Sequence, residues 1–514
     1  FKTNYFTMTI LAEATTIDYW PLFILLVGVA WVVIGITKFR LHPFLTLILA
    51  AFLVGLMTGP LPELTPENKG LYHDRVELKE SSGEPTSDLI KAIKWSLLGF
   101  GNTAGGIGLV VALAAIIGTC MMKSGAADRV VRSLMKLFGQ ENAGLVLLLS
   151  GFLLSIPVFF DTVFFLLIPL ARALALRTGK NYTFYVMAMA GAGAITHSMV
   201  PPTPGPLMIA DGLGLDLGHA MIAGLVASIL PAILVLKMAG WFDRKYAIPM
   251  REVAGASSED LRAIVDKKDN ELPPLILAAL PIALPVLIIS SVSVLKLLMK
   301  SADEASPLAT EGFLDFFEYL AFFGNPNVAM TLAAAVALYT LSREITKGSS
   351  KGKLSEKLSK SLEGPLGTAG VIILITGAGG AFGGMIRLAG VGDVIGAMAQ
   401  EFDISYVLLA WLATAIVRIA QGSATVAMIT GVGLMSAVIG DGSSLPYHPL
   451  YVFLAIGFGS ITLSWMNDSG FWVVQKLSGF TEKETLQTWS VLLTAIALLG
   501  LLITLLGSTF LPLI

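Results

Sequence analysis

The chain has 514 residues, of which 55% are hydrophobic and only 14% are charged. Soluble domains carry about 25% charged residues, so this composition excludes a chain that keeps itself in water. A net charge of −2 offers no basic surface for nucleic acid, and the single cysteine excludes a disulfide framework. The five histidines are scattered, which argues against a histidine-rich metal site. A polytopic membrane protein without a cofactor is therefore expected.

The apolar segments, taken in chain order, predict about ten crossings, because one crossing needs about 20 apolar residues. The N-terminal stretch lacks a basic region, so no removable signal peptide is expected. Two apolar stretches, 141–176 and 405–440, are too long for one crossing and are broken in the middle, which predicts two re-entrant hairpins. The predicted crossings are 20–38, 41–58, 96–122, 183–210, 219–242, 273–296, 326–341, 366–388, 449–475 and 488–510.

The sidedness of the loops follows from their Lys and Arg residues, which mark the cytoplasmic side. Loops 243–272 and 342–363 are rich in both and belong inside, whereas the acid-rich loops 59–90 and 297–325 belong outside. Both termini are then outside. The same reasoning makes hairpin 141–176 enter from the cytoplasm and the other hairpin enter from outside.

An internal repeat divides the chain. At a shift of 265 residues, Thr103-Ala104-Gly105 aligns with Thr368-Ala369-Gly370, and at 266 the stretch GAGAITHS from Gly191 falls on GFGSITLS from Gly457. Each half has an odd number of crossings, so the second half is inverted. The predicted units are a first repeat at 1–242 with two scaffold helices, a cytoplasmic linker at 243–272 and an inverted repeat at 273–514. Such repeats are typical of secondary transporters. A duplicated scaffold protein is the alternative, but it does not explain polar breaks at matching depths.

Four polar interruptions carry the functional prediction: the two hairpin tips and the two discontinuous helices, 183–210 and 449–475. Half-helix N-termini present unpaired N–H groups that suit a carboxylate, and Gly, Ser and Thr let the backbone approach a ligand. This chemistry fits a small organic anion. The predicted substrate-binding residues are Thr196, Ser198, Thr203, Gly205, Arg418, Gln421, Gly422, Ser423, Thr425, Asn467, Ser469 and Gly470.

Ionisable residues at membrane depth are functional candidates by default. The planar guanidinium group of Arg418 can donate two hydrogen bonds to one carboxylate. The alternative roles for Arg418 are a structural ion pair or a side chain that snorkels outward. Asp161, His197 and Asp468 are candidates for proton coupling. Capping or a hydrogen-bond network is the alternative for the two aspartates, and a satisfied core position is the alternative for the histidine. Asn102 and Thr103 are interpreted as a cap at the start of an apolar run.

These motifs resemble the gluconate permease family (GntP, gluconate:proton symporters) of the ion-transporter superfamily, over about 97–505. The resemblance lies in GAGAITHSMVPPTPGP from Gly191, RIAQGSATVAM from Arg418, NDSGFW from Asn467 and TWSV from Thr488. It implies proton-coupled import of gluconate or a related sugar acid, through an elevator-like motion, by a homodimer in the inner membrane of a bacterium. Thr203, Ser198 and Asp161 depart from the family's usual histidine, glycine and glutamate, so other hydroxy acids or a small amino acid stay open.

The sequence leaves three alternative functions open. Sodium could replace the proton as the coupling ion, with hairpin-tip oxygens as its ligands. An intramembrane enzyme would need a metal or nucleophile constellation, and the chain has no HExxH motif, so no enzymatic activity is expected. A channel fits poorly, because paired breaks favour an occluding site over a continuous pore.

Overall fold

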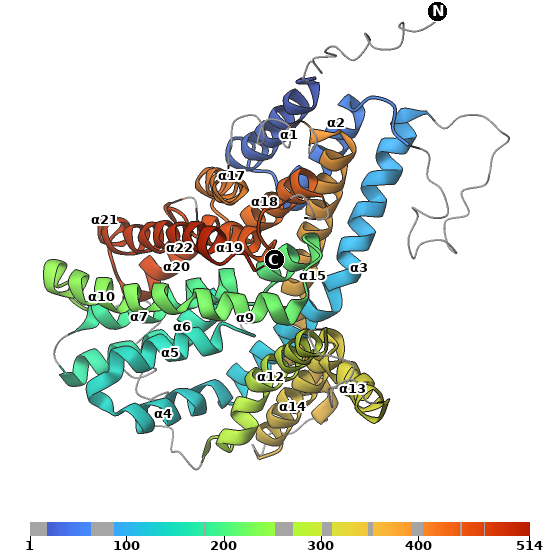
Figure 1. Cartoon of the computed structure of the whole chain (residues 1–514). Coiled ribbons are helices and arrows are strands. Elements are labelled where there is room, and N and C mark those ends of the chain that lie inside the picture. Colours follow the sequence, from blue (N-terminus) through green and yellow to red (C-terminus); the bar gives the residue numbers. More distant parts are fainter. Residues whose placement is uncertain are drawn as a thin grey trace, which may run out of the picture.

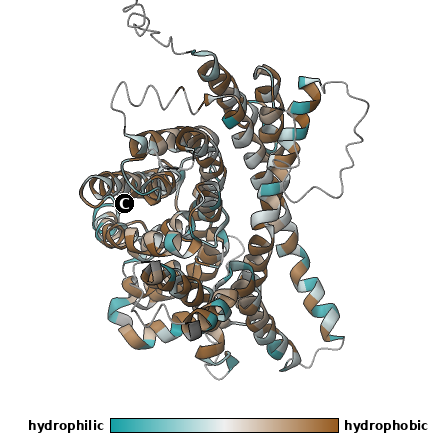
Figure 2. Cartoon of the chain, turned by 45° about the vertical axis from the view of Figure 1, so that its right-hand side comes forward, coloured by the Kyte–Doolittle hydropathy of each residue, from teal (hydrophilic) through white to brown (hydrophobic). Residues whose placement is uncertain are grey.

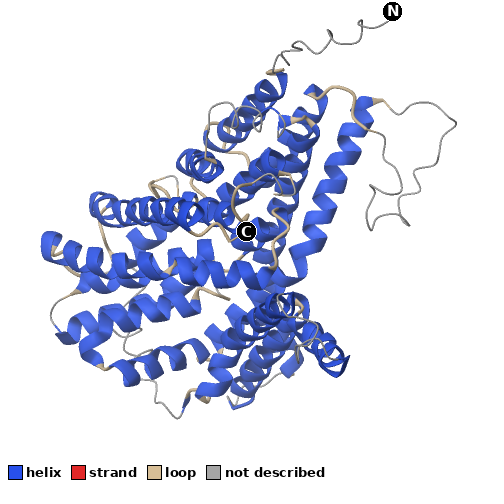
Figure 3. Cartoon of the chain, viewed as in Figure 1, coloured by secondary structure: helices blue, strands red, loops and turns tan. Residues whose placement is uncertain are grey.

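The computed structural model describes residues 18–62, 87–157, 159–178, 181–251, 271–300, 311–347, 353–391, 394, 405–440, 442, 445–466 and 468–513. All regular structure in these ranges is helical, which confirms the predicted all-α class (Figure 3).

Two long helices, α3 (Asp88–Lys123) and α15 (Leu354–Leu388), pack side by side through much of the molecule (Figure 1). Helices α1 (Trp20–Thr37) and α2 (Pro43–Met57) lie beside their upper part in that view. The interpretation of Asn102 and Thr103 as a helix cap is wrong, because both lie in the interior of α3. The helix begins at Asp88, several turns before these two residues.

Helices α12 (Leu275–Lys300), α13 (Glu311–Gly324) and α14 (Pro326–Lys347) pack against one another at the other end of the long pair (Figure 1). The prediction of a loop over 297–325 is wrong, because α13 occupies Glu311–Gly324. Charge counting missed the helix because its acidic residues stand among aromatic residues such as Phe316 and Tyr319.

The rest of the first half forms a bundle beside the long helices. It contains α4 (Ala126–Phe138), the short η3 (Gln140–Asn142), α5 (Ala143–Leu154), α6 (Phe160–Thr178), α7 (Tyr182–Met199), α8 (Pro204–Gly212), α9 (Leu217–Ala227) and α10 (Ile229–Tyr246). Helix α7 ends where the proline run begins, and α8 starts at Pro204. A proline is tolerated in the first turn of a helix, because that turn needs no amide donor.

The second half supplies the remainder of this bundle. Its helices are α17 (Tyr406–Gln421), α18 (Ala424–Ile439), α19 (Leu450–Gly459), α20 (Ser469–Ser478), α21 (Glu482–Thr485), the π-helical turn η6 (Leu486–Ser490) and α22 (Val491–Phe510). Between α19 and α20 the described backbone is not helical. The chain is therefore interrupted both here and after α7.

Six described helices are long and apolar enough to cross a membrane, and six more apolar helices are shorter. Many large hydrophobic side chains of these helices are exposed. The brown ribbon in Figure 2 shows that hydrophobic residues make up most of the helices. Apolar surface of this extent marks contact with lipid or another protein. The protein is a multi-pass membrane protein.

Candidate functional site

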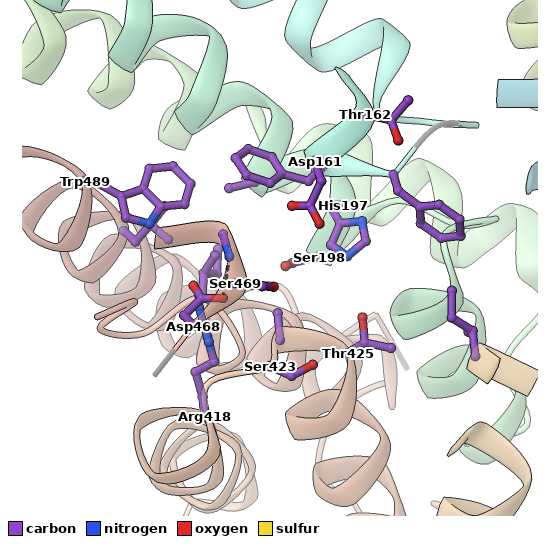
Figure 4. A pocket seen from close by; sticks show the side chains of 18 of the residues that line it. Asp161, Thr162, His197, Ser198, Arg418, Ser423, Thr425, Asp468, Ser469 and Trp489 are labelled. Carbon is purple, nitrogen blue, oxygen red and sulfur yellow. Dashed lines mark hydrogen bonds and ion pairs between the residues drawn. The ribbon is translucent and has the colours of Figure 1, made fainter. Parts of the chain in front are cut away.

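The four chain interruptions meet around one pocket of about 300 Å³ (Figure 4). This volume lies at the lower end of the range for ligand sites, which indicates a small molecule. The lining residues are Phe159, Phe160, Asp161, Thr162, Ala194, His197, Ser198, Thr368, Ile372, Arg418, Ser423, Ala424, Thr425, Ile461, Asp468, Ser469, Gly470, Trp489 and Leu493.

Three helices begin at this pocket. Helix α6 starts at Phe160, α18 follows Ser423, whose hydroxyl caps the amide of Val426, and α20 follows Asp468, whose carboxylate caps the amide of Gly470 at 2.9 Å. The first turn of a helix carries unpaired N–H groups and a partial positive charge. Three such ends around one pocket favour an anionic ligand.

A buried ion pair joins the second hairpin tip to the second break. Arg418 Nη2 lies 2.5 Å from Asp468 Oδ2, and the two side chains are only 3% and 9% exposed. Arg418 Nη1 also donates to the carbonyl oxygen of Gly422. The structural ion pair, the alternative interpretation of Arg418, is thus present. The Nε of Arg418 is buried and has no partner in the described part of the chain.

A short hydrogen-bond chain extends from this pair. The Ser464 hydroxyl donates to Asp468 Oδ2, and the indole Nε1 of Trp489 donates to the Ser464 oxygen at 2.7 Å. Trp489 lies in the π-helical turn, and its ring stacks on Phe160 with the ring centroids 5.4 Å apart. The turn therefore links the second break to the start of α6.

Two polar atoms from the end of α7 lie at the pocket without partners among the described residues. They are Nδ1 of His197 and Oγ of Ser198, and both atoms are buried. Buried polar atoms in native proteins are nearly always hydrogen-bonded. Their position therefore favours a ligand as the missing partner. The Asp161 carboxylate points into the same space (Figure 4).

Some of the residues predicted to bind substrate are not among those lining the pocket. Thr196 donates to the carbonyl of Ala192 in its own helix, and Thr203 donates to the carbonyls of His197 and Val200. Gly205 packs on the side chain of Met428, and Gly422 ends α17 with a left-handed φ of 87°. These four residues shape the interruptions, while the ligand-facing positions are their neighbours. The Gln421 side chain and Asn467 lie outside the described residues.

Sequence reasoning missed Trp489, Thr368 and Ile372 as lining residues. Trp489 belongs to the TWSV motif, and Thr368 belongs to the repeat alignment. Both residues therefore stood in motifs that indicated the family or the repeat, but neither was predicted to line the site. Thr368, Phe159 and Thr162 also line a second pocket of about 190 Å³, which adjoins the first between α3 and α15. Among the described residues, no group of three or more His, Cys, Asp or Glu side chains is placed to hold a metal.

The family comparison agrees with these features. The GntP family permease model matches residues 20–65 and 78–510. The chain is 34% identical over 487 residues to a gluconate permease of Pseudomonas aeruginosa, covering 94% of this chain and 96% of that protein. It is 28% identical over 482 residues to the Gnt-II system L-idonate transporter of Escherichia coli strain K12, covering 94% and 98%.

The fold is shared with a solved transporter. The YdaH transporter of Alcanivorax borkumensis superposes with a TM-score of 0.56 at 16% identity, covering 92% of this chain and 100% of that one. At this identity the likeness concerns the fold alone. The family model, by contrast, spans nearly the whole chain with the site motifs included, and the chain belongs to the GntP permease family.

Proposed function

We propose that this permease is a secondary active transporter that imports gluconate or a related sugar acid together with protons. The observation that carries the proposal is the convergence of three helix N-termini on one small pocket that also holds unpartnered polar atoms. Helix N-termini bind carboxylates without a free cation. Relatives named for gluconate and L-idonate support a sugar acid as the substrate class.

Alternating access would use two inverted repeats. The helix order α3, α5–α6, α7–α8 recurs as α15, α17–α18, α19–α20 at a shift close to the one in the sequence, which supports the repeat. Helix α5 has 12 residues, so it spans about 18 Å, too short to cross a hydrocarbon core of about 30 Å. Re-entrant hairpins, one from each side, fit this length. The moving part would be the bundle beside α3 and α15, in a homodimer of a bacterial inner membrane, with both termini outside.

Thr203, which stands where the family usually has a histidine, interacts with the backbone. Its hydroxyl donates to carbonyl oxygens at the end of α7. This residue therefore sets the shape of the break and does not present its oxygen to the pocket. Ser198, by contrast, leaves its oxygen free at the pocket wall and can serve a substrate hydroxyl. Gluconate is therefore the first substrate to test.

The test is uptake of labelled gluconate into proteoliposomes with an inward proton gradient and no sodium. Accumulation above the external concentration that collapses with a protonophore is expected. Uptake that never raises the internal gluconate concentration above the external one would indicate a channel. Accumulation that requires sodium would show that sodium, and not the proton, is the coupling ion. No accumulation of gluconate or any tested hydroxy acid under either gradient would refute the transporter assignment.

A further inference from the structure

The two carboxylates at the pocket are held in very different ways. Asp468 accepts hydrogen bonds from Arg418, from the Ser464 hydroxyl and from the Gly470 amide. Each of these groups donates to Asp468, an arrangement that suits a carboxylate. Asp468 is therefore held in place by three donors and paired with Arg418.

Asp161 is held by none of these groups. It lies in the first turn of α6 and lines the pocket, and within the described part of the chain no hydrogen bond or ion pair reaches its carboxylate. Its carboxylate points into the same space as His197 and Ser198 (Figure 4). Asp161 can therefore gain or lose a proton without breaking a bond of the fold.

The charges at the pocket make this difference functional. Arg418 and Asp468 cancel one another, so Asp161 decides the net charge felt by a bound anion, together with His197 on the end of α7. When Asp161 is ionised, it repels a substrate carboxylate at the helix N-termini. When Asp161 is protonated, that repulsion disappears.

We propose that Asp161 binds the coupling proton, while Asp468 stays ionised and paired with Arg418 throughout the cycle. The inference rests on the proposed function and assigns its proton site. A proton from the outer solution adds to the Asp161 carboxylate, the substrate anion binds, and both leave on the inner side, so one positive and one negative charge move together. Linkage is reciprocal, so bound substrate also favours the protonated state.

The experiment compares two kinds of flux in proteoliposomes for the wild type, Asp161→Asn, Asp161→Glu and Asp468→Asn. Counterflow measures exchange of labelled for unlabelled gluconate and needs no net proton movement, whereas accumulation under a proton gradient does. Asp88→Asn is the matched control, because Asp88 lies at the exposed start of α3, where it pairs with Lys91. Monodisperse elution of each variant in detergent establishes that it folds.

Asp161→Asn should retain counterflow and lose accumulation. Its apparent affinity for gluconate should stay constant with pH, whereas that of the wild type should fall by about tenfold per pH unit once Asp161 ionises. Asp161→Glu should regain accumulation, and Asp88→Asn should behave as the wild type. Asp468→Asn should lose counterflow as well, because it leaves Arg418 unpaired at the site.

Two results would overturn the assignment: proton-driven accumulation by Asp161→Asn at the wild-type level, or retained counterflow with lost accumulation in Asp468→Asn, which would reverse the roles. A folded Asp161→Asn without counterflow would also contradict it, since the amide imitates the protonated state. A wild type that exchanges gluconate but never accumulates it with protons would instead remove the proposed function on which the inference rests.

Discussion

Removing one member of the Arg418–Asp468 pair should destabilise the protein strongly. The two side chains are 3% and 9% exposed, so either charge left alone would stay buried. Removing one partner of a buried pair costs about 3–5 kcal/mol, most of it from the uncompensated charge that remains. We expect a loss of this size in the free energy of unfolding for Arg418→Met and for Asp468→Asn.

The double variant Arg418→Met with Asp468→Asn separates the two contributions. It contains no buried charge at this position, so its stability should recover by at least about 2 kcal/mol relative to the sum of the single losses. Unfolding by denaturant in mixed micelles, followed by tryptophan fluorescence, gives the four free energies of the cycle. Single losses below about 1 kcal/mol, or losses that simply add, would show that water or lipid headgroups reach the pair and that the reasoning from burial is wrong.

Three further predictions follow from named contacts. Trp489→Phe keeps the ring stack on Phe160 and loses only the indole hydrogen bond, so it should cost about 0.5–1.5 kcal/mol in unfolding free energy and weaken gluconate binding in counterflow. Gly224→Ala would press a methyl group into the backbone oxygen of Met199, beside the first break, and should lower the thermal midpoint and the exchange rate together. Burial alone would raise the pKa of Asp216, but the Ser293 hydroxyl and the neighbouring positive charges leave it below its usual value. Its stabilising effect is therefore complete above the usual aspartate range and lost as the pH falls through the lower folded-state value, and Asp216→Asn should flatten the acid limb of a stability–pH curve.

The interruptions of the helices could be predicted from the sequence because their cause is local. Prolines between 201 and 206 stop α7 wherever that helix packs, and the polar stretch around Asp468 cannot continue α19 without a cost. Because the predicted repeat relates these breaks, the sequence predicts that they lie at equal depth. The structure brings Asp161, His197, Arg418 and Asp468 to one pocket, which agrees with that prediction.

The exact lining of the pocket could not be predicted, because it depends on how each segment is rotated in the bundle. Thr196 and Ser198 are neighbours on α7, yet only the latter reaches the pocket. Trp489 faces the site through a π-helical turn, which changes the angular position expected from an α-helical period. Helix α13 was missed because a charge-based topology rule reports sidedness and does not report local structure.

The contact between α15 and α18 offers a final test of the proposed elevator-like motion. A methyl group on Gly383 would lie 2.7 Å from the Cα atom of Gly433. A backbone atom, unlike a flexible side chain, cannot move away unless its helix shifts. Small residues permit such close approach between membrane helices and leave a surface with few side chains that interdigitate.

If the bundle slides along α15, Gly383→Ala should impair movement more than binding. Overpacking of this kind costs about 1–3 kcal/mol in stability. We expect a many-fold slower counterflow with an almost unchanged affinity for gluconate in detergent. Gly384→Ala, one residue along the same helix, meets nothing within 4 Å and serves as the control. Equal exchange rates for the two variants would mean that α18 does not move past α15, and the moving boundary would have to lie elsewhere in the fold.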